Sequence, residues 1–585
     1  MWPLKQKQSA APPRSELSAA LASCRGTFVS IGLISGMSNI LMLTGSFFML
    51  EVYDRVLPSH SLQTLVGLMV LAGGLFVMLG LLDTIRGRIL VRVGANLDET
   101  LSGRVYDTLV RLPLKVGNRS DGMLPLRDLD SVRSFLSGLG PIALFDLPWL
   151  PVYLAICFMF HPYIGLAALA GAIVLGLLTL LTEAMTRMPT QAATGFAVTR
   201  NALADASRRN AEALSAMGMS ARFGEQWRDA NRNYMASQQR ASDVAGGFGA
   251  LSKVLRMLVQ SGVLAVGAYL VINQQATAGI IIAGSILSAR ALAPVDLAIA
   301  NWRGFVAARQ GWQRLTKLLA LMPLKSEPVA LPAPQKTIAV ETIVVVPPGG
   351  DKAVVQDVSF SLQAGSGLGI IGPSGSGKSC LARLLVGVWQ PARGRVRLDG
   401  ASLDQWTPDK LGRHIGYLPQ DVELMAGTVA QNIARFESTD NSEALIAAAE
   451  AAGVHDLIVD LPQGYDTQVG ERGAALSAGQ AQRIALARAL YRDPFLVVLD
   501  EPNSNLDAEG DEALSAAIAG VRARDGIVIV VAHRPAAIVS VDLVLVMHKG
   551  RAQAFGPKDD VLARAVQNVN PRPLKVVTDN ESAQR

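Results

Sequence analysis

The stretch from residue 372 to residue 379 combines residue types that bind phosphate. Two glycines enclose four residues and a Lys-Ser pair follows, in the order Gly372, Pro373, Ser374, Gly375, Ser376, Gly377, Lys378 and Ser379. An apolar strand is expected before this loop and a helix after it, which is the context in which the pattern binds nucleotide phosphates. Backbone N–H groups and the helix N-terminus would face the anion. Lys378 would reach the β- and γ-phosphates, and Ser379 would ligate Mg²⁺.

Two adjacent acids follow an apolar run further along the chain. Residues 495–499 (FLVVL) predict a buried strand that ends at Asp500 and Glu501. In a mostly parallel α/β sheet, the carboxyl end of such a strand lies beside the phosphate loop. Asp500 then suits the Mg²⁺ shell, and Glu501 is placed to orient or deprotonate water. Without the phosphate loop, a helix N-cap with a solvated neighbour would be the simpler interpretation.

The elements that position these residues begin near residue 337. Short β-rich runs separated by Gly, Pro and helical stretches predict strands at 337–346, 354–360, 367–372, 495–501, 526–533 and 542–548. Apolar strands alternating with helices imply a mostly parallel sheet covered on both faces. We expect an α/β domain over 337–565, preceded by a linker over 306–336 that is rich in Pro from 321 onward, and a disordered tail over 566–585.

The first half of the chain has the composition of a membrane protein. Only 17% of the 585 residues are charged, against about 25% in an average soluble protein. Six apolar runs are long enough to cross a hydrocarbon core of about 30 Å, at 28–51, 64–84, 141–160, 163–182, 250–272 and 278–300. We therefore expect an all-α transmembrane domain over 28–305, after a short cytoplasmic segment over 1–27.

The cations of this half cluster in two long loops, between spans two and three and between spans four and five. Because positively charged loops stay inside, both loops and both termini are expected in the cytoplasm. This clustering accounts for the net charge of +6 without a nucleic-acid partner. Both loops contain helix-forming sequence, so the membrane helices should continue into the cytoplasm. Short helices at their ends either contact the soluble domain, which we favour, or are simply solvated.

Charged side chains also occur within the apolar runs. Lys253 and Arg256 lie near the start of span five, and Arg290 and Asp296 lie in span six. A lipid-facing charge is costly, so such residues either line an internal path or pair with one another. We favour a pathway or gate for Arg290 and Asp296. The three cysteines have no metal-ligand spacing and are expected to be free thiols.

Further motifs resemble the ABC transporter family over nearly the whole chain. Residues 417–420, which end at Gln420, are similar to the glutamine loop, and residues 476–480 to the signature sequence. Residues 504–507 are similar to the D-loop, and His533 to the switch histidine. Ala478 stands where the signature usually has Gly. The family also stacks an aromatic residue on adenine, whereas no Phe, Tyr or Trp lies between Trp312 and Phe360 here, and the aligned region is 346–348.

The resemblance implies the type I ABC exporter fold, with six transmembrane helices followed by a P-loop nucleotide-binding domain, acting as a homodimer. Each ATP would lie between the phosphate loop of one copy, extended by Cys380, and the signature of the other, represented by Ser477, Gly479 and Gln480. The residues that would hold Mg²⁺ are Ser379, Gln420 and Asp500. The catalytic residues would be Glu501, His533, Gln420 and Lys378.

Within the family, the chain resembles the peptidase-free permease of type I secretion systems. The segments that carry this likeness are 52–58 (VYDRVLP), 146–149 (DLPW), 289–296 (ARALAPVD) and 501–507 (EPNSNLD). The likeness implies ATP-driven export of unfolded proteins with an uncleaved C-terminal signal across the inner membrane of a Gram-negative cell. It also implies a periplasmic adaptor and an outer-membrane channel as partners. About 27 residues precede span one, so no leader peptidase is expected.

Three other functions compete with protein export. A lipid or small-molecule exporter would share the fold and the ATPase motifs, and only the membrane-half segments favour protein as the cargo. A soluble ATPase acting on DNA or ribosomes is disfavoured by the six apolar runs. An ATP-gated channel is favoured by no feature of the sequence.

Overall fold

The fold is taken from a computed structural model, which describes residues 16–117, 122–323, 331–438, 441–532 and 538–567. The chain divides into two compact units, one of residues 1–112 and 120–323 and the other of residues 113–119 and 324–585. His533 and the predicted tail from residue 568 onward lie outside the described residues.

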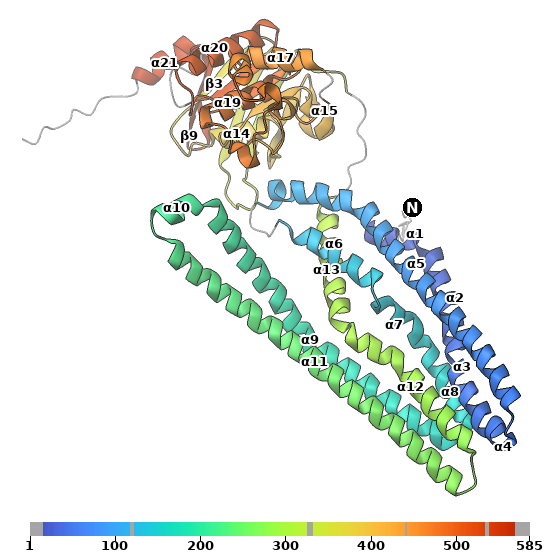
Figure 1. Cartoon of the computed structure of the whole chain (residues 1–585). Helices are drawn as coiled ribbons and strands as arrows, with labels where there is room; N and C mark the ends of the chain where they lie inside the picture. The colour runs from blue at the N-terminus through green and yellow to red at the C-terminus, as the bar shows by residue number, and fades with distance from the viewer. Residues whose placement is uncertain (1–15, 118–121, 324–330, 439–440, 533–537, 568–585) are drawn as a thin grey trace, which may run out of the picture. The chain divides into compact units, whose positions relative to one another are not determined.

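The first unit is entirely helical in its described part (Figure 1). Its helices are α1 (Glu16–Ser23), α2 (Arg25–Met42), α3 (Thr44–Glu51), η1 (Val52–Val56), α4 (Leu57–Ser59), α5 (Leu62–Val116, whose last residues belong to the second unit), α6 (Leu124–Ser137), α7 (Gly140–Asp146), η2 (Leu147–Trp149), α8 (Leu150–Phe160), α9 (Pro162–Arg209), α10 (Ala211–Ala216), α11 (Ser220–Ile272), α12 (Ala278–Ala300) and α13 (Trp302–Leu321).

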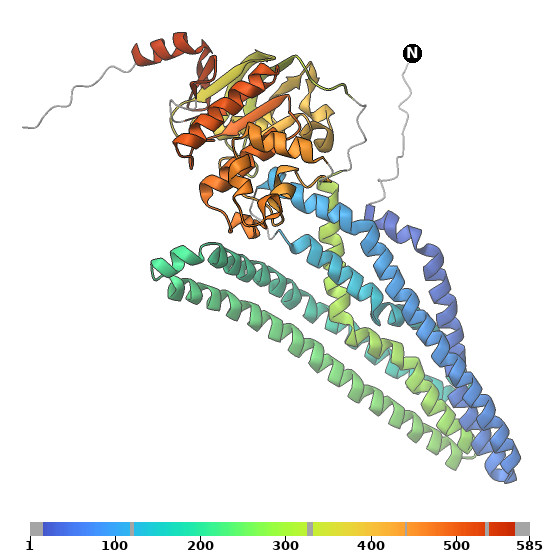
Figure 2. The same ribbon diagram turned by 45° about the horizontal axis from the view of Figure 1, so that its top comes forward.

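Six helical segments of this unit are long and apolar enough to cross a membrane, which confirms the number predicted from the sequence. They are 25–59, 62–116, 140–160, 162–209, 220–272 and 278–300. Three of them extend well past the predicted apolar runs, as expected from the helix-forming loops. The 55 residues of α5 measure about 80 Å, and α9 and α11 run side by side to the short helix α10 (Figures 1 and 2).

Helix α13 follows span six and covers the beginning of the segment that we assigned to the linker. It is amphipathic and buries Val306, Leu315 and Leu319. Leu315 and Leu319 pack with residues of α1, α5 and α6, and charged contacts hold the same helix. Arg314 forms two hydrogen bonds with Asp128 of α6, at 2.6 and 2.8 Å. Residues 302–321 are therefore an ordered part of the membrane unit.

Three aspartates of the secretion-like segments connect helices to one another. Asp54 of η1 accepts hydrogen bonds from Thr277 Oγ1 and from Gly279 N at the start of α12, at 2.7 and 2.9 Å. Asp146 of α7 is buried and lies 2.9 Å from Arg86 of α5. Asp296 of α12 pairs with Arg256 of α11 at 2.8 Å. For Asp296, the structure thus shows pairing between spans five and six.

The second unit contains two sheets. Its elements are β1 (Thr337–Val345), β2 (Val355–Gln363), β3 (Gly367–Ile371), α14 (Lys378–Leu385), β4 (Arg393–Leu398), β5 (Ala401–Ser402), η3 (Leu403–Gln405), α15 (Pro408–Gly412), β6 (Ile415–Leu418), α16 (Val429–Ile433), α17 (Ser442–Ala451), α18 (His455–Val459), η4 (Gly464–Asp466), η5 (Glu471–Gly473), α19 (Ala478–Leu490), β7 (Leu496–Asp500), α20 (Ala508–Ala523), β8 (Ile527–Val531), β9 (Leu543–His548), β10 (Arg551–Pro557) and α21 (Lys558–Gln567).

The larger sheet has the strand order β10-β9-β3-β8-β7-β6, with parallel pairing from β9 to β6. This confirms the mostly parallel sheet predicted from the sequence. The first two predicted strands instead belong to a separate antiparallel sheet with the order β2-β1-β4-β5. The sequence analysis did not predict β4, β5, β6 or β10, which are shorter or more polar than the buried parallel strands.

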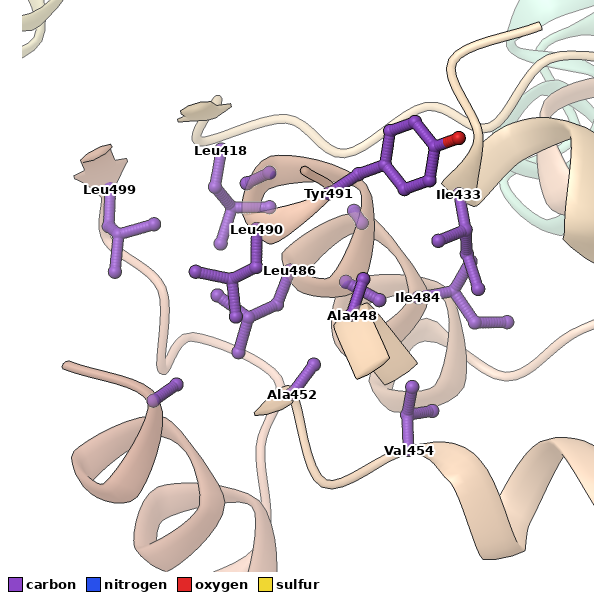
Figure 3. Packing of buried hydrophobic residues seen from close by; sticks show 14 of the residues in the cluster. Leu418, Ile433, Ala448, Ala452, Val454, Ile484, Leu486, Leu490, Tyr491 and Leu499 are labelled. Atoms are coloured by element: carbon purple, nitrogen blue, oxygen red, sulfur yellow. The ribbon is translucent and has the colours of Figure 1, made fainter. Parts of the chain in front are cut away.

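Helix α19 is held in the centre of the larger hydrophobic cluster of this unit. Leu486 and Leu490 of the helix lie in one buried cluster with Leu418 of β6 and Leu499 of β7 (Figure 3). Ala448 of α17 and Val454, which follows that helix, belong to the same cluster. Burying side chains of this size stabilises the fold by about 1.5–3 kcal/mol each. This packing fixes the helix against the ends of β6 and β7.

Candidate nucleotide site

The predicted site residues follow the carboxyl ends of neighbouring parallel strands. Gly372 comes directly after β3, Asp500 is the last residue of β7, and Gln420 lies two residues after β6. Strand β8 lies between β3 and β7, and His533 follows it outside the described residues. Ligands of open α/β sheets bind at this edge. Among the described residues, the topology thus gathers three motifs that are far apart in the sequence.

The phosphate loop requires glycine where its backbone passes other chain segments. Gly377 has φ = +94°, and an added Cβ atom there would lie 2.9 Å from the carbonyl oxygen of Val354. At Gly372 an added Cβ atom would lie 2.1 Å from the carbonyl oxygen of Met547. Gly377 is also the N-cap of α14, so the helix N-terminus opens directly on the loop. This arrangement presents backbone N–H groups to an anion.

Lys378 is buried within its own loop. Its ammonium donates hydrogen bonds to the carbonyl oxygens of Gly372 and Pro373, at 2.9 and 3.0 Å. Burial lowers the pKa of Lys378, while the nearby carboxylates of Glu501 and Asp500 act in the opposite direction. Within the described part of the chain, the cation is therefore held beside two acids and bonded only to neutral carbonyls, which phosphate oxygens can replace.

Ser379 and Asp500 meet at the base of the loop. Ser379 Oγ donates to Asp500 Oδ1 at 3.1 Å, and Asp500 Oδ2 is buried without a hydrogen-bond partner among the described residues. Burial raises the pKa of Asp500, and the adjacent Glu501 acts in the same direction. A buried, under-bonded carboxylate beside a hydroxyl is the oxygen donor set that Mg²⁺ takes together with phosphate oxygens. The residues present therefore fit the predicted cation.

Glu501 stands at a backbone position that orients its side chain. Its φ is +53°, a left-handed conformation that is uncommon for residues other than glycine. Its N–H donates to the carbonyl oxygen of Val531 of β8 at 3.0 Å. Gln420 Nε2 donates to Glu501 Oε2 at 3.3 Å. The glutamine and the predicted base are therefore in contact at the end of β7.

Ser477, Gly479 and Gln480 form the start of α19. Ser477 is the N-cap, and Ser477 and Gln480 exchange two hydrogen bonds of 2.9 and 3.2 Å in a capping box. An added Cβ atom at Gly479 would lie 3.0 Å from the carbonyl oxygen of Asn505. Across the described residues of one chain, no hydrogen bond joins this group to the phosphate loop. The structure thus gathers the phosphate loop, Gln420, Asp500 and Glu501, but not the signature.

Gln482 and Arg483 tie the signature helix to the residues after β7. Gln482 is buried, its amide nitrogen donates to the carbonyl oxygen of Pro502, and its amide oxygen accepts from Asn505 N at 3.1 Å. Arg483 pairs with Asp507 at 2.5 Å. Neither Gln482 nor Arg483 was given a role from the sequence alone. Their only sequence signal is that a buried apolar helix carries polar residues directly after its cap.

The two units together define a class of protein. Six apolar helices of membrane-spanning length precede an α/β unit whose phosphate loop, buried carboxylate and adjacent acid are arranged for nucleotide hydrolysis. The chain thus combines a unit with membrane-spanning helices and an α/β unit that carries a phosphate loop.

Comparison with known proteins places this class in a family. The model of the ABC transporter family matches residues 355–504, and that of the ABC transporter transmembrane region matches residues 28–295. The type I secretion system ATP-binding protein PrsD of Rhizobium meliloti (strain 1021) is 58% identical over 97% of this chain and 98% of its own. The chain belongs to the ABC transporter family, in its branch of type I secretion ATP-binding proteins.

Two more distant proteins agree with this assignment. The cyclolysin secretion/processing ATP-binding protein CyaB of Bordetella pertussis (strain Tohama I) is 30% identical over 93% of this chain and 77% of its own. The solved structure of a bacterial Atm1-family ABC exporter with ATP bound is 27% identical, with a TM-score of 0.76 over 93% of this chain and 97% of that one. The six-helix exporter fold followed by an ATPase unit is therefore shared.

Proposed function

We propose that this protein exports unfolded polypeptides across the bacterial inner membrane as the ATP-driven permease of a type I secretion system. The observation that carries this proposal is the 58% identity, over nearly the full length of both chains, to a type I secretion ATP-binding protein. The alternative is a lipid or small-molecule exporter, which would share the fold and the ATPase motifs. The Atm1-family exporter, at 27% identity, supports the shared exporter fold and names no cargo.

In the proposed mechanism, ATP is first bound by the phosphate loop. The backbone N–H groups of the residues other than Pro373 in the loop 372–380 and the N-terminus of α14 face the phosphates. Lys378 exchanges the carbonyl oxygens of Gly372 and Pro373 for phosphate oxygens. Mg²⁺, when bound, neutralises phosphate charge, and Ser379, Asp500 and Gln420 are the residues that would hold it.

Hydrolysis then depends on the acid that follows β7. Glu501 orients a water molecule toward the γ-phosphate and accepts its proton, and Gln420 positions Glu501 through the hydrogen bond between their side chains. His533, which resembles the switch histidine and is assigned a catalytic role on that likeness, lies outside the described residues.

The form of the protein that hydrolyses ATP is a homodimer. Because Ser477, Gly479 and Gln480 are not bonded to the phosphate loop of their own chain, we place them against the nucleotide held by the second copy. The two sites would close around ATP and open again after hydrolysis. A switch of this kind, controlled by the γ-phosphate, can move other segments of a protein. The long helices α5, α9 and α11 are the mechanical elements available to carry this motion.

The proposed partners complete an envelope-spanning conduit. A periplasmic adaptor and an outer-membrane channel would continue the path beyond the inner membrane. The cargo is a secreted protein with a C-terminal signal, and no nucleic acid is involved. The nucleotide-binding unit faces the cytoplasm, as the cation-rich loops indicate.

The function is tested by deleting the gene and comparing the proteins in the culture medium by mass spectrometry. We expect at least one secreted protein to disappear and to return with the wild-type gene but not with a Glu501→Gln copy. An unchanged secreted proteome together with an altered lipid composition of the envelope would overturn the proposal in favour of a lipid exporter.

A further inference from the structure

Arg290 is the exception in an otherwise enclosed helix. In the most apolar 18-residue stretch of span six (α12), 56% of the residues are buried, against 11–33% in the corresponding stretches of the other five spans. Between Gly279 and Ile299, Arg290 is the one exposed side chain in this fully described segment. It lies about 18 Å along the helix from Ala278 and about 15 Å from Ala300, close to mid-span.

The surface of α12 around Arg290 lacks the exposed apolar side chains of a lipid-facing helix. Each of the other five spans exposes large apolar side chains, such as Leu33, Val70, Met159, Leu180 and Ile272. Helix α12 exposes none of this kind along its described length. A guanidinium at the centre of a bilayer costs several kcal/mol unless it faces water or a partner. At mid-span, Arg290 is also far from the phosphates of the lipid headgroups.

The ion pairs of the spans leave no acid for Arg290. Within the six predicted apolar runs the acidic residues are Glu51, Asp83, Asp146 and Asp296. Each pairs with another arginine, at 3.8, 2.9, 2.9 and 2.8 Å respectively. Arg290 itself makes no hydrogen bond or ion pair with the described residues. A second copy of the chain offers the same four acids, already paired, and the same unpaired arginine.

We propose that Arg290 is a cargo-binding residue that contacts carboxylates of acidic segments as the polypeptide passes span six. The inference rests on the proposed export function. A planar guanidinium binds carboxylates through two parallel hydrogen bonds, and these charge-assisted bonds are stronger than those between neutral groups. The site therefore favours stretches rich in Asp and Glu over equally long neutral stretches.

The experiment uses the full-length protein in its native host with the secreted protein identified by the deletion test. Two forms of that cargo are compared, one native and one with acidic residues of a chosen segment changed to Asn and Gln. Export of each form is measured for wild type, Arg290→Gln and Arg290→Lys. Lys253→Gln, which removes another exposed cation near the start of span five, is the matched control.

We expect Arg290→Gln to lower the export ratio of native to neutralised cargo by about 10-fold. Arg290→Lys should keep most of the ratio, and Lys253→Gln should leave it at the wild-type value. A wild-type ratio in Arg290→Gln overturns the site, as does an equal loss of both cargo forms, which indicates a structural role. If the export loss in Arg290→Gln varies with the anionic lipid content of proteoliposomes, the cargo site is overturned and Arg290 instead binds a lipid phosphate. Failure of the deletion test, by contrast, removes the export function itself.

Discussion

At the scale of single residues, the nucleotide site depends on carboxylates in unequal environments. Asp500 is buried, and its pKa is raised mainly by burial, whereas Glu501 is half-buried at a strained backbone position. The buried acid suits a fixed cation, and the more accessible acid suits water. The two neighbouring acids are therefore suited to the separate roles that we propose for them.

Glu501→Gln should leave ATP binding intact while reducing turnover by at least about 100-fold, because the amide cannot accept a proton. The dimer should then accumulate in its closed, ATP-bound form. Turnover is measured by phosphate release and binding by equilibrium titration. Rapid hydrolysis by this variant would refute the assignment of Glu501 as the base.

Lys378→Ala should act on binding itself. Removing the ammonium deletes a charge-assisted contact to phosphate, so we expect ATP affinity to fall by about 10- to 100-fold. The measurement is equilibrium titration with a fluorescent ATP analogue. Unchanged affinity would show that Lys378 does not contact the phosphates.

At the scale of elements, a buried polar network joins the first three spans. Arg86 of α5 contacts both oxygens of Asp146 of α7, at 2.9 and 3.2 Å, and the hydroxyl of Ser35 of α2 at 2.9 Å. Asn39 of α2 donates to the same carboxylate at 2.8 Å and accepts from the hydroxyl of Tyr153 of α8 at 2.9 Å. These hydrogen bonds thus connect helices α2, α5, α7 and α8.

This network predicts a non-additive pair of substitutions. Arg86→Gln alone leaves the buried carboxylate of Asp146 without a countercharge, so it should destabilise the protein by about 3–5 kcal/mol. Asp146→Asn alone leaves Arg86 paired with the more exposed Asp83, so its cost should be smaller. The double variant should lose less than the sum of the single variants, because neither charge remains. Thermal unfolding in detergent measures the three values.

The matched control is Arg232→Gln. Arg232 pairs with Asp229, but both side chains are largely exposed, at 77% and 63%. Such a surface pair contributes about 0–1 kcal/mol before screening by salt. Strictly additive losses at Arg86 and Asp146 would show that the two residues stabilise the bundle independently.

At the scale of the whole molecule, the predicted site residues fall into two groups that no hydrogen bond joins within the described chain. The phosphate loop, Gln420, Asp500 and Glu501 are joined by hydrogen bonds within the chain, whereas Ser477 and Gln480 bond to each other at the start of α19. A head-to-tail arrangement of two copies would bring the second group to the first. Two identical sites would then form at the seam of the homodimer.

Mixing two inactive chains tests this arrangement. A chain with Ser477→Arg keeps its phosphate loop, and a chain with Lys378→Ala keeps its signature. Each homodimer should be inactive, but a mixed dimer has one intact site. With random pairing and independent sites, turnover should recover to about one quarter of wild type, as two-fold symmetry requires. No recovery after co-expression, with mixed dimers confirmed by two affinity tags, contradicts the shared site.

The sequence by itself determined the two-part organisation and most of the nucleotide site. Hydrophobic length depends only on consecutive residues, so six spans were predictable from runs such as 64–84 and confirmed as helices. The phosphate loop is equally local, because Gly377, Lys378 and Ser379 must be adjacent to wrap a phosphate. Strands β3, β7 and β8 were predictable because strands buried on both faces are continuously apolar.

Only the tertiary structure decided which distant residues are partners. Nothing local in the sequence joins Arg86 to Asp146 or Arg256 to Asp296, because these pairs arise when separate helices pack. Gln482 became a connector only when the start of α19 was placed against the residues after β7. Arg290 differs from the other span charges for the same reason, since exposure and the lack of a partner are properties of the packed bundle.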